Sequence, residues 1–186
     1  MINPALLVID VQNDYFSGGT MELVEMELAA RNVQKLLSIF RKNNWPAVFI
    51  QHLALKPTAS FFIPNTFGAN IHKSVQPLEN ETIIIKHFPN SFRETSLNEY
   101  LQSLQISDIV ICGAMTHMCI DTSVRAATDL GYSCLLIHDA CATRDLAYNN
   151  VTVNAADVQI AYMAALNGSF ANVISVEEFV SSHQSQ

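Results

Sequence analysis

Three reactive side chains follow three apolar segments of the chain, and together they could carry out nucleophilic chemistry. Asp10 lies near the end of the apolar run 5–11, and Lys86 ends a run that contains three isoleucines. Cys119 comes shortly after a third apolar run, 109–114. A carboxylate can take the proton of a thiol, and a nearby ammonium lowers the pKa of that thiol. We therefore expect a nucleophilic site built from these three residues.

Each of the three also has a structural interpretation. Asp10 interrupts a hydrophobic segment, so it needs either a charged partner or a chemical role. Lys86 taken alone could be the polar end of a strand, and Cys119 could be an inert buried thiol. Cys119 also opens a segment of helical period, where the positive end of a helix dipole would favour the thiolate. The coincidence of all three favours a catalytic site.

The elements that must position these residues alternate between short apolar runs and helical patterns, which is typical of a parallel α/β sheet. Residues of such a sheet converge at the carboxyl ends of its strands, where ligands bind. The irregular segment 52–81 is long enough to suggest a functional role. We see no internal boundary and expect one domain over residues 1–186. Strands are predicted at 5–11, 47–51, 82–86, 109–113, 133–138 and 171–175, and helices at 24–43, 95–104, 119–130, 151–166 and 176–181.

Composition narrows the class of protein. The chain has 186 residues, of which 49% are hydrophobic and 15% charged, with a net charge of −7. No cluster of Lys or Arg could follow a phosphate backbone, so we expect no nucleic-acid partner. The apolar stretches are shorter than a membrane span, and the start has no basic segment typical of a signal peptide, so we expect a cytoplasmic protein without a membrane partner. The four cysteines form no C-x-x-C pair and are expected to be reduced.

One predicted helix suggests self-association. Residues 151–166 are apolar on more than one face, which is typical of a helix that is central in a domain or packed against another subunit. Together with the high apolar fraction, this pattern favours a homodimer or a higher homo-oligomer.

Three long motifs resemble those of the isochorismatase-like cysteine hydrolases, a superfamily that includes nicotinamidases, N-carbamoylsarcosine amidase and streptothricin hydrolases. The motifs are LLVIDVQNDYFSGG at 6–19, KHFPNSF at 86–92 and GAMTHMCIDTSVRAATDLGY at 113–132. The resemblance runs nearly end to end. It implies a three-layer αβα sandwich with a six-stranded, mostly parallel, Rossmann-like sheet. It also implies a catalytic triad of Asp10, Lys86 and Cys119, an oxyanion hole formed by the backbone N–H groups of Met115 and Cys119, and a cis peptide bond at Ala114–Met115.

Residues next to the triad motifs are candidates for a substrate pocket, namely Tyr15, Phe88, Phe92 and His117. Phe92 could equally pack in the core, and His117 could merely cap a turn. In the loop after the first strand, Gln12, Asn13 and Asp14 are expected to bind backbone groups through their side chains.

The resemblance departs from nicotinamidases at the metal site. Those enzymes bind a metal through Asp and His residues just after the second strand, and this chain has no Asp-x-His pattern there. His52 and His72 could form a loose pair, but satisfied or solvent-facing histidines are the simpler interpretation. We expect neither a required metal nor another cofactor.

Three functions remain open at this point. The leading hypothesis is a cysteine-dependent hydrolase that cleaves a C–N bond of a small amide, lactam or carbamoyl compound through a thioester. The second is an isochorismatase-type hydrolase of a vinyl ether, in which Asp10 acts as an acid and Cys119 is dispensable. The third is a binding module that has kept the fold without activity.

Overall fold

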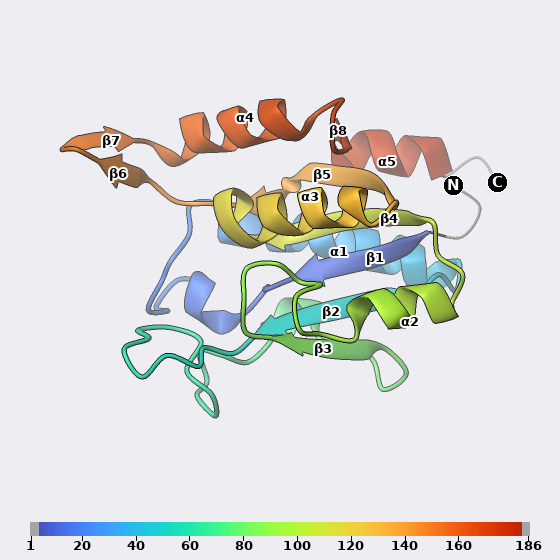
Figure 1. Ribbon diagram of the computed structural model, residues 1–186, viewed down its shortest axis with the longest axis horizontal. Helices are drawn as coiled ribbons and strands as arrows, with labels where there is room; N and C mark the ends of the chain where they lie inside the picture. Colours follow the sequence, from blue (N-terminus) through green and yellow to red (C-terminus); the bar gives the residue numbers. More distant parts are fainter. Residues whose placement is uncertain (1–3, 184–186) are drawn as a thin grey trace.

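The computed structural model describes residues 4–183 and centres on a six-stranded parallel sheet (Figure 1). The strand order is β3-β2-β1-β4-β5-β8, and every neighbouring pair is parallel. The predicted fold class is confirmed. The strands are β1 (Ala5–Ile9), β2 (Ala47–His52), β3 (Thr82–Lys86), β4 (Asp108–Ala114), β5 (Ser133–Ala142) and β8 (Asn172–Ile174).

Helices cover both faces of this sheet. One face packs against α1 (Met26–Lys42) and α5 (Val176–His183). The other packs against α2 (Leu97–Ser103), α3 (Asp121–Asp129) and α4 (Ala155–Leu166). The resulting order of layers is helix, sheet, helix, as the resemblance implied.

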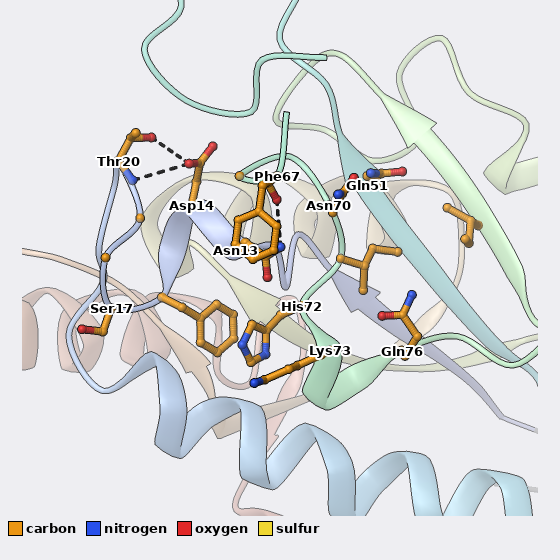
Figure 2. A pocket seen from close by; sticks show the side chains of 16 residues that line it. Asn13, Asp14, Ser17, Thr20, Gln51, Phe67, Asn70, His72, Lys73 and Gln76 are labelled. Atoms are coloured by element: carbon orange, nitrogen blue, oxygen red, sulfur yellow. Dashed lines mark hydrogen bonds between the residues drawn. The ribbon is translucent and has the colours of Figure 1, made fainter. Parts of the chain in front are cut away.

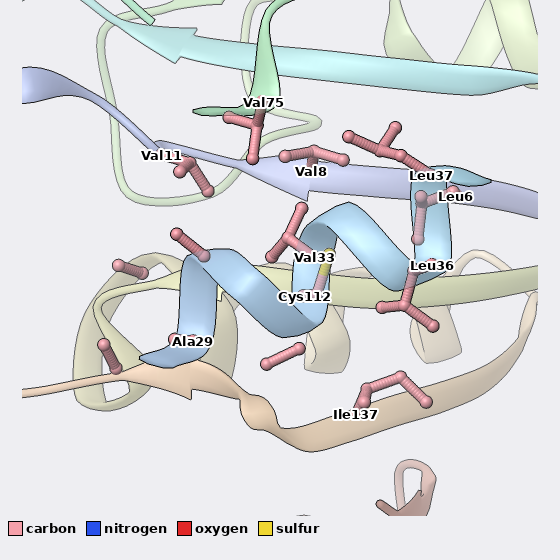
Figure 3. Close-up of a cluster of buried hydrophobic side chains, with 14 of the residues drawn as sticks. Leu6, Val8, Val11, Ala29, Val33, Leu36, Leu37, Val75, Cys112 and Ile137 are labelled. Atoms are coloured by element: carbon pink, nitrogen blue, oxygen red, sulfur yellow. The ribbon is translucent and has the colours of Figure 1, made fainter. Parts of the chain in front are cut away.

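The unbroken apolar sequence of β1 follows from this double coverage. Successive strand residues point to opposite faces, so Leu6 and Val8 join the α1 cluster while Leu7 and Ile9 join the opposite one. Figure 3 shows Leu6 and Val8 facing the apolar side of α1. A central parallel strand therefore has no polar face.

The strand order reverses beside β1. The chain runs from β1 to β2 and β3 on one side, and then returns to β4 on the other side of β1. Ligands of open α/β sheets bind at the carboxyl ends of strands where the order reverses in this way. Asp10 follows β1 at that point, and the turn that carries Cys119 follows β4.

Four predicted helices begin two to four residues later than the sequence suggested, and another element stands before two of them. Cys119 lies inside a π-helical turn, η3 (Thr116–Ile120), and α3 begins only at Asp121. The predicted helix 151–166 is wrong in its first turn, because β7 (Val151–Val153) pairs antiparallel with β6 (Leu146–Tyr148). β-Branched residues favour a strand there, and Asn149 and Asn150 adopt the positive φ angles of a tight hairpin turn.

The irregular segment 52–81 contains one short 3-10 helix, η2 (Lys73–Val75), and is tied to the loop after β1. Gln12 Nε2 donates to the carbonyls of His52 (2.9 Å) and Ala69 (2.8 Å). Asn13 Nδ2 donates to a carbonyl of the same segment at 2.8 Å, and Asp14 Oδ2 accepts a backbone N–H at 2.7 Å. Figure 2 shows the Asn13 contact. The predicted side-chain to backbone bonds are therefore confirmed, and they fix the segment against the site.

The remaining expectations about the chain concern thiols and membranes. All four cysteines are free, as predicted. Within residues 4–183, no helix combines the length and the apolar character that crossing a membrane requires.

Candidate active site

The structure brings Asp10, Lys86 and Cys119 together at the carboxyl edge of the sheet. Lys86 Nζ lies 2.8 Å from Asp10 Oδ2 and 3.1 Å from Cys119 Sγ. Asp10 and Lys86 are 0% exposed, and Cys119 is 4% exposed. A buried charge is tolerated only with a partner, so the ion pair explains how both charges persist in the interior.

Three separate elements deliver these side chains. Asp10 adopts a left-handed φ of 52° directly after β1, which ends the strand and turns its carboxylate toward Lys86. Lys86 ends β3, two strands from β1, and its long side chain reaches across the end of β2. Cys119 comes from the turn after β4. The site therefore depends on the order of four adjacent strands.

The Lys86 ammonium has two further acceptors. Its Nζ lies 2.9 Å from His52 Nδ1 and 3.1 Å from the carbonyl of Phe88. Burial opposes the charge of Lys86, but Asp10 and Cys119 outweigh that effect and raise the pKa of the amine. Lys86 therefore remains a cation.

The proton of Cys119 stays on the sulfur at rest. Burial and the Asp10 carboxylate raise the pKa of the thiol above its ordinary value, and Lys86 lowers it by less. This result differs from the expectation of a thiolate stabilised by a helix terminus. Asp10 Oδ2 pairs with Lys86 Nζ at 2.8 Å, and the Asp10 carboxylate also hydrogen-bonds the Cys119 thiol, so it lies directly beside the thiol proton. A thiol in this state must lose its proton before it can act as a nucleophile.

Three side chains that could bind a metal ion lie around the Lys86 ammonium. One donor atom each from Asp10, His52 and Cys119 lies within 4.8 Å of the others. The Nζ atom of Lys86 contacts all three residues, at 2.8, 2.9 and 3.1 Å, so a positive charge already fills the centre of this set. A divalent cation there would be repelled by that charge. His72 hydrogen-bonds the Ser74 side chain instead of joining the set.

Of the predicted pocket residues, Tyr15 lies next to the triad. It is buried against Phe61 and Phe62, with ring centroids 6.1 and 4.7 Å away. Burial raises the pKa of Tyr15 well above its usual value, and Cys119 and Asp10 add to this effect. Its hydroxyl therefore stays protonated beside Cys119 and Asp10.

The other predicted pocket residues differ in position. The carbonyl oxygen of Phe88 accepts a hydrogen bond from Lys86. The ring of Phe92 stacks on that of Tyr132, with 6.0 Å between the ring centroids, and packs against the core. Phe92 therefore has the core-packing role that the sequence left open for it. His117 Nδ1 lies 2.6 Å from Thr143 Oγ1, so its ring is held by the loop after β5.

A cavity of about 440 Å³ adjoins the triad through His52 and Phe88, both of which contact Lys86. Its lining is mostly apolar and includes Phe61 and Phe62 from the irregular segment. Sequence reasoning missed these two phenylalanines, although an aromatic pair in a long loop was a usable signal. The larger hollow of about 760 Å³ in Figure 2 is lined by Asp14, His72 and others but by none of the triad residues.

His52 gives the site a measurable acid sensitivity. Burial and then Lys86 lower the pKa of His52 from 6.5 to about 4. A depressed histidine pKa means that the unfolded state binds the proton first as pH falls below 6.5, so stability is lost between 6.5 and about 4. We expect the free energy of unfolding to fall by about 2.5 kcal/mol more in wild type than in His52→Asn between about pH 7 and about pH 4.5. Urea unfolding at both pH values measures the difference.

The asparagine variant is a suitable control because its amide oxygen can still accept from Lys86. Equal pH dependence in the two proteins would show that His52 is not held neutral by its surroundings.

The fold agrees with the comparisons. An isochorismatase domain model matches residues 4–178, so the chain belongs to the isochorismatase family of hydrolases. Isochorismatase family protein YddQ of Bacillus subtilis (strain 168), itself uncharacterized, is 51% identical over 95% of this chain and 98% of its own. A solved isochorismatase hydrolase structure from Oleispira antarctica is 49% identical, with a TM-score of 0.93 and 96% coverage of both chains. A streptothricin hydrolase of Streptomyces noursei is 29% identical over 76% of this chain and 50% of its own.

Proposed function

We propose that this protein is a cysteine hydrolase that cleaves the C–N bond of a small amide, lactam or carbamoyl compound through a thioester. The observation that carries the proposal is the contact of one buried ammonium with both a carboxylate and a thiol. Streptothricin hydrolase and nicotinamidase are among the relatives, which supports a C–N bond as the target.

The mechanism follows from the protonated resting thiol. Asp10 takes the proton of Cys119 as the sulfur attacks the substrate carbonyl carbon, which gives a tetrahedral oxyanion. When this species collapses, the C–N bond breaks and the Asp10 carboxylic acid returns the proton to the leaving nitrogen. Water then gives a proton to Asp10 while its oxygen attacks the thioester, and the sulfur leaves and regains a proton from Asp10.

The role of Lys86 is electrostatic. Its ammonium lies between the two reacting groups, so it stabilises the negative charge whether that charge resides on oxygen or on sulfur. Because burial excludes water from the pair, this stabilisation is stronger than it would be in solvent.

The oxyanion hole is assigned to the backbone N–H groups of Met115 and Cys119. Both belong to the chain that leaves β4, and the Ala114–Met115 peptide bond is cis. Donors of this kind lower a barrier by about 3 kcal/mol each.

Substrate screening tests the proposal directly. Small carboxamides, lactams and carbamoyl compounds are offered to the protein, and released ammonia or amine is measured together with the mass of quenched protein. We expect turnover with a transient acyl adduct on Cys119, and a loss of about a thousandfold or more in Cys119→Ala and in Asp10→Asn.

Cys134→Ala is the matched control, because Cys134 is also buried and free but packs in the core. It should retain turnover. Full activity of Cys119→Ala on isochorismate, with no acyl adduct in wild type, would instead establish the vinyl-ether reaction that uses Asp10 as the acid.

A further inference from the structure

We propose that two copies of this chain pair by exchanging the β6–β7 hairpin, so that the arm of each copy lies in an apolar groove of the other. The arm is residues 146–153. The groove is defined below by its lining residues.

The arm has no support from its own sheet. In the described part of the chain, β6 and β7 pair only with each other. Figure 1 shows them extending beyond the body of the domain, next to the first turn of α4. An isolated two-stranded hairpin is at best marginally stable in water. Tyr148 is 81% exposed and Val151 63% exposed, so the arm presents large apolar side chains with nothing from its own domain over them.

The apolar surface continues from the arm onto α4. From Leu146 to Leu166 the sequence contains a single charged residue, Asp157, although charged residues make up 15% of the whole chain. Ile160 on the outer side of α4 is 67% exposed. Surfaces that are both apolar and depleted in charge are typical of the buried centre of protein interfaces.

A groove of about 370 Å³ lies at the base of the arm. It is formed by the start of α1, the end of β5 and the start of α4, and Thr143 and Ala155 place it directly beside both ends of the hairpin. Val24, Leu28 and Ile160 line it and are themselves exposed. The groove thus offers apolar side chains of the same kind as those that the arm presents.

A two-fold axis between two copies would bring the arm of each copy to the groove of the other. When two arms lie antiparallel across a two-fold axis, the tip of each one reaches the base of the other, and each base carries a groove. The arm is about 14 Å long, since four residues separate its base from its tip and each adds about 3.4 Å. One operation therefore covers both arms and both grooves, which makes a second copy of this chain the occupant that the surface fits.

The partner subunit would also lie against Gln159, which hydrogen-bonds the turn that carries Cys119. Gln159 lines the groove, and its Oε1 accepts a hydrogen bond from Thr116 Oγ1 at 2.7 Å. Its Nε2 donates to the carbonyl of His138 at 2.9 Å. Thr116 is the first residue of the π turn that carries Cys119, so dimerisation covers the residue that connects α4 to this turn.

Sedimentation velocity at micromolar concentration tests the interface. We expect wild type to be a dimer, and Ile160→Asp and Tyr148→Ser to shift it to monomer. Ile83→Asp should remain a dimer, because Ile83 is 48% exposed on the opposite edge of the sheet. Tyr148 is almost fully exposed, so its replacement leaves the fold of the monomer intact, which circular dichroism verifies. A monomeric wild type, dimeric arm variants, or dissociation caused by Ile83→Asp would each overturn the proposal.

Disulfide trapping tests the geometry. Tyr148→Cys protein is mixed with Leu28→Cys protein under mild oxidation, and the mixed disulfide is measured by non-reducing electrophoresis and mass spectrometry. We expect efficient linkage of this pair, and a yield at least tenfold lower when Ile83→Cys replaces Leu28→Cys. Equal yields for the two pairings would overturn arm exchange.

Discussion

Replacing Lys86 with methionine is expected to lower the free energy of unfolding by about 3–5 kcal/mol. The substitution preserves most of the side-chain volume but removes the charge 2.8 Å from Asp10 Oδ2. Asp10 is completely buried and its carboxylate has no other cationic side chain within ion-pair distance among the described residues except His52, which is neutral. An uncompensated buried carboxylate is among the costliest defects in a folded protein. Urea unfolding of the variant measures the loss.

A double variant separates stability from chemistry. In Asp10→Asn/Lys86→Met no charge remains buried, so most of the lost stability should return, while turnover should stay absent. Exchange of a buried ion pair for neutral groups is often neutral or stabilising. If Lys86→Met alone unfolded with the same free energy as wild type, the ion pair described above would not exist in solution. A double variant that is inactive but more stable than wild type would mark a site where stability has been sacrificed for activity.

Gly113→Ala is expected to prevent accumulation of folded protein, with a loss of about 4 kcal/mol or more. Gly113 lies in β4 with a φ of +122°, and a Cβ there would collide with the backbone carbonyl oxygen of Ile9 in the adjacent strand. The same pairing sets β4 against the end of β1, next to Asp10. Relief of the collision would therefore separate the strand that precedes Cys119 from the strand that precedes Asp10.

Gly131→Ala is the matched control. Gly131 also has a positive φ, +93°, but nothing lies within 4 Å of a Cβ placed there. Only the backbone preference is violated, so we expect a loss of about 1 kcal/mol. Soluble expression and thermal unfolding measure both variants, and similar behaviour of the two would show that the contact with Ile9 is unimportant.

The fold and the three central residues could be predicted from sequence because both depend on local signals. Buried parallel strands are continuous apolar runs, and Asp10 and Lys86 stand at the ends of two of them. Once the sheet is parallel, residues at its carboxyl edge converge whatever their separation in the chain.

The remainder depends on contacts that no local pattern contains. The neutral state of Cys119 results from burial beside Asp10, and His52 accepts from Lys86 only because β2 lies between β1 and β3. The hairpin at 146–153 was missed for another reason. Its apolar residues continue into α4 without a break, so the predicted helix was extended back over residues 151–153, which form β7.

Because Cys119 is protonated at rest, its sulfur is expected to resist oxidation by peroxides. Peroxides attack thiolates far faster than thiols, and sulfinic and sulfonic acids form from exposed, ionised cysteines. A sulfur that is ionised only as substrate is attacked, and that is otherwise shielded from solvent, escapes this damage between turnovers. In the mechanism proposed above, the arrangement that makes Asp10 the base therefore also protects the nucleophile from irreversible oxidation.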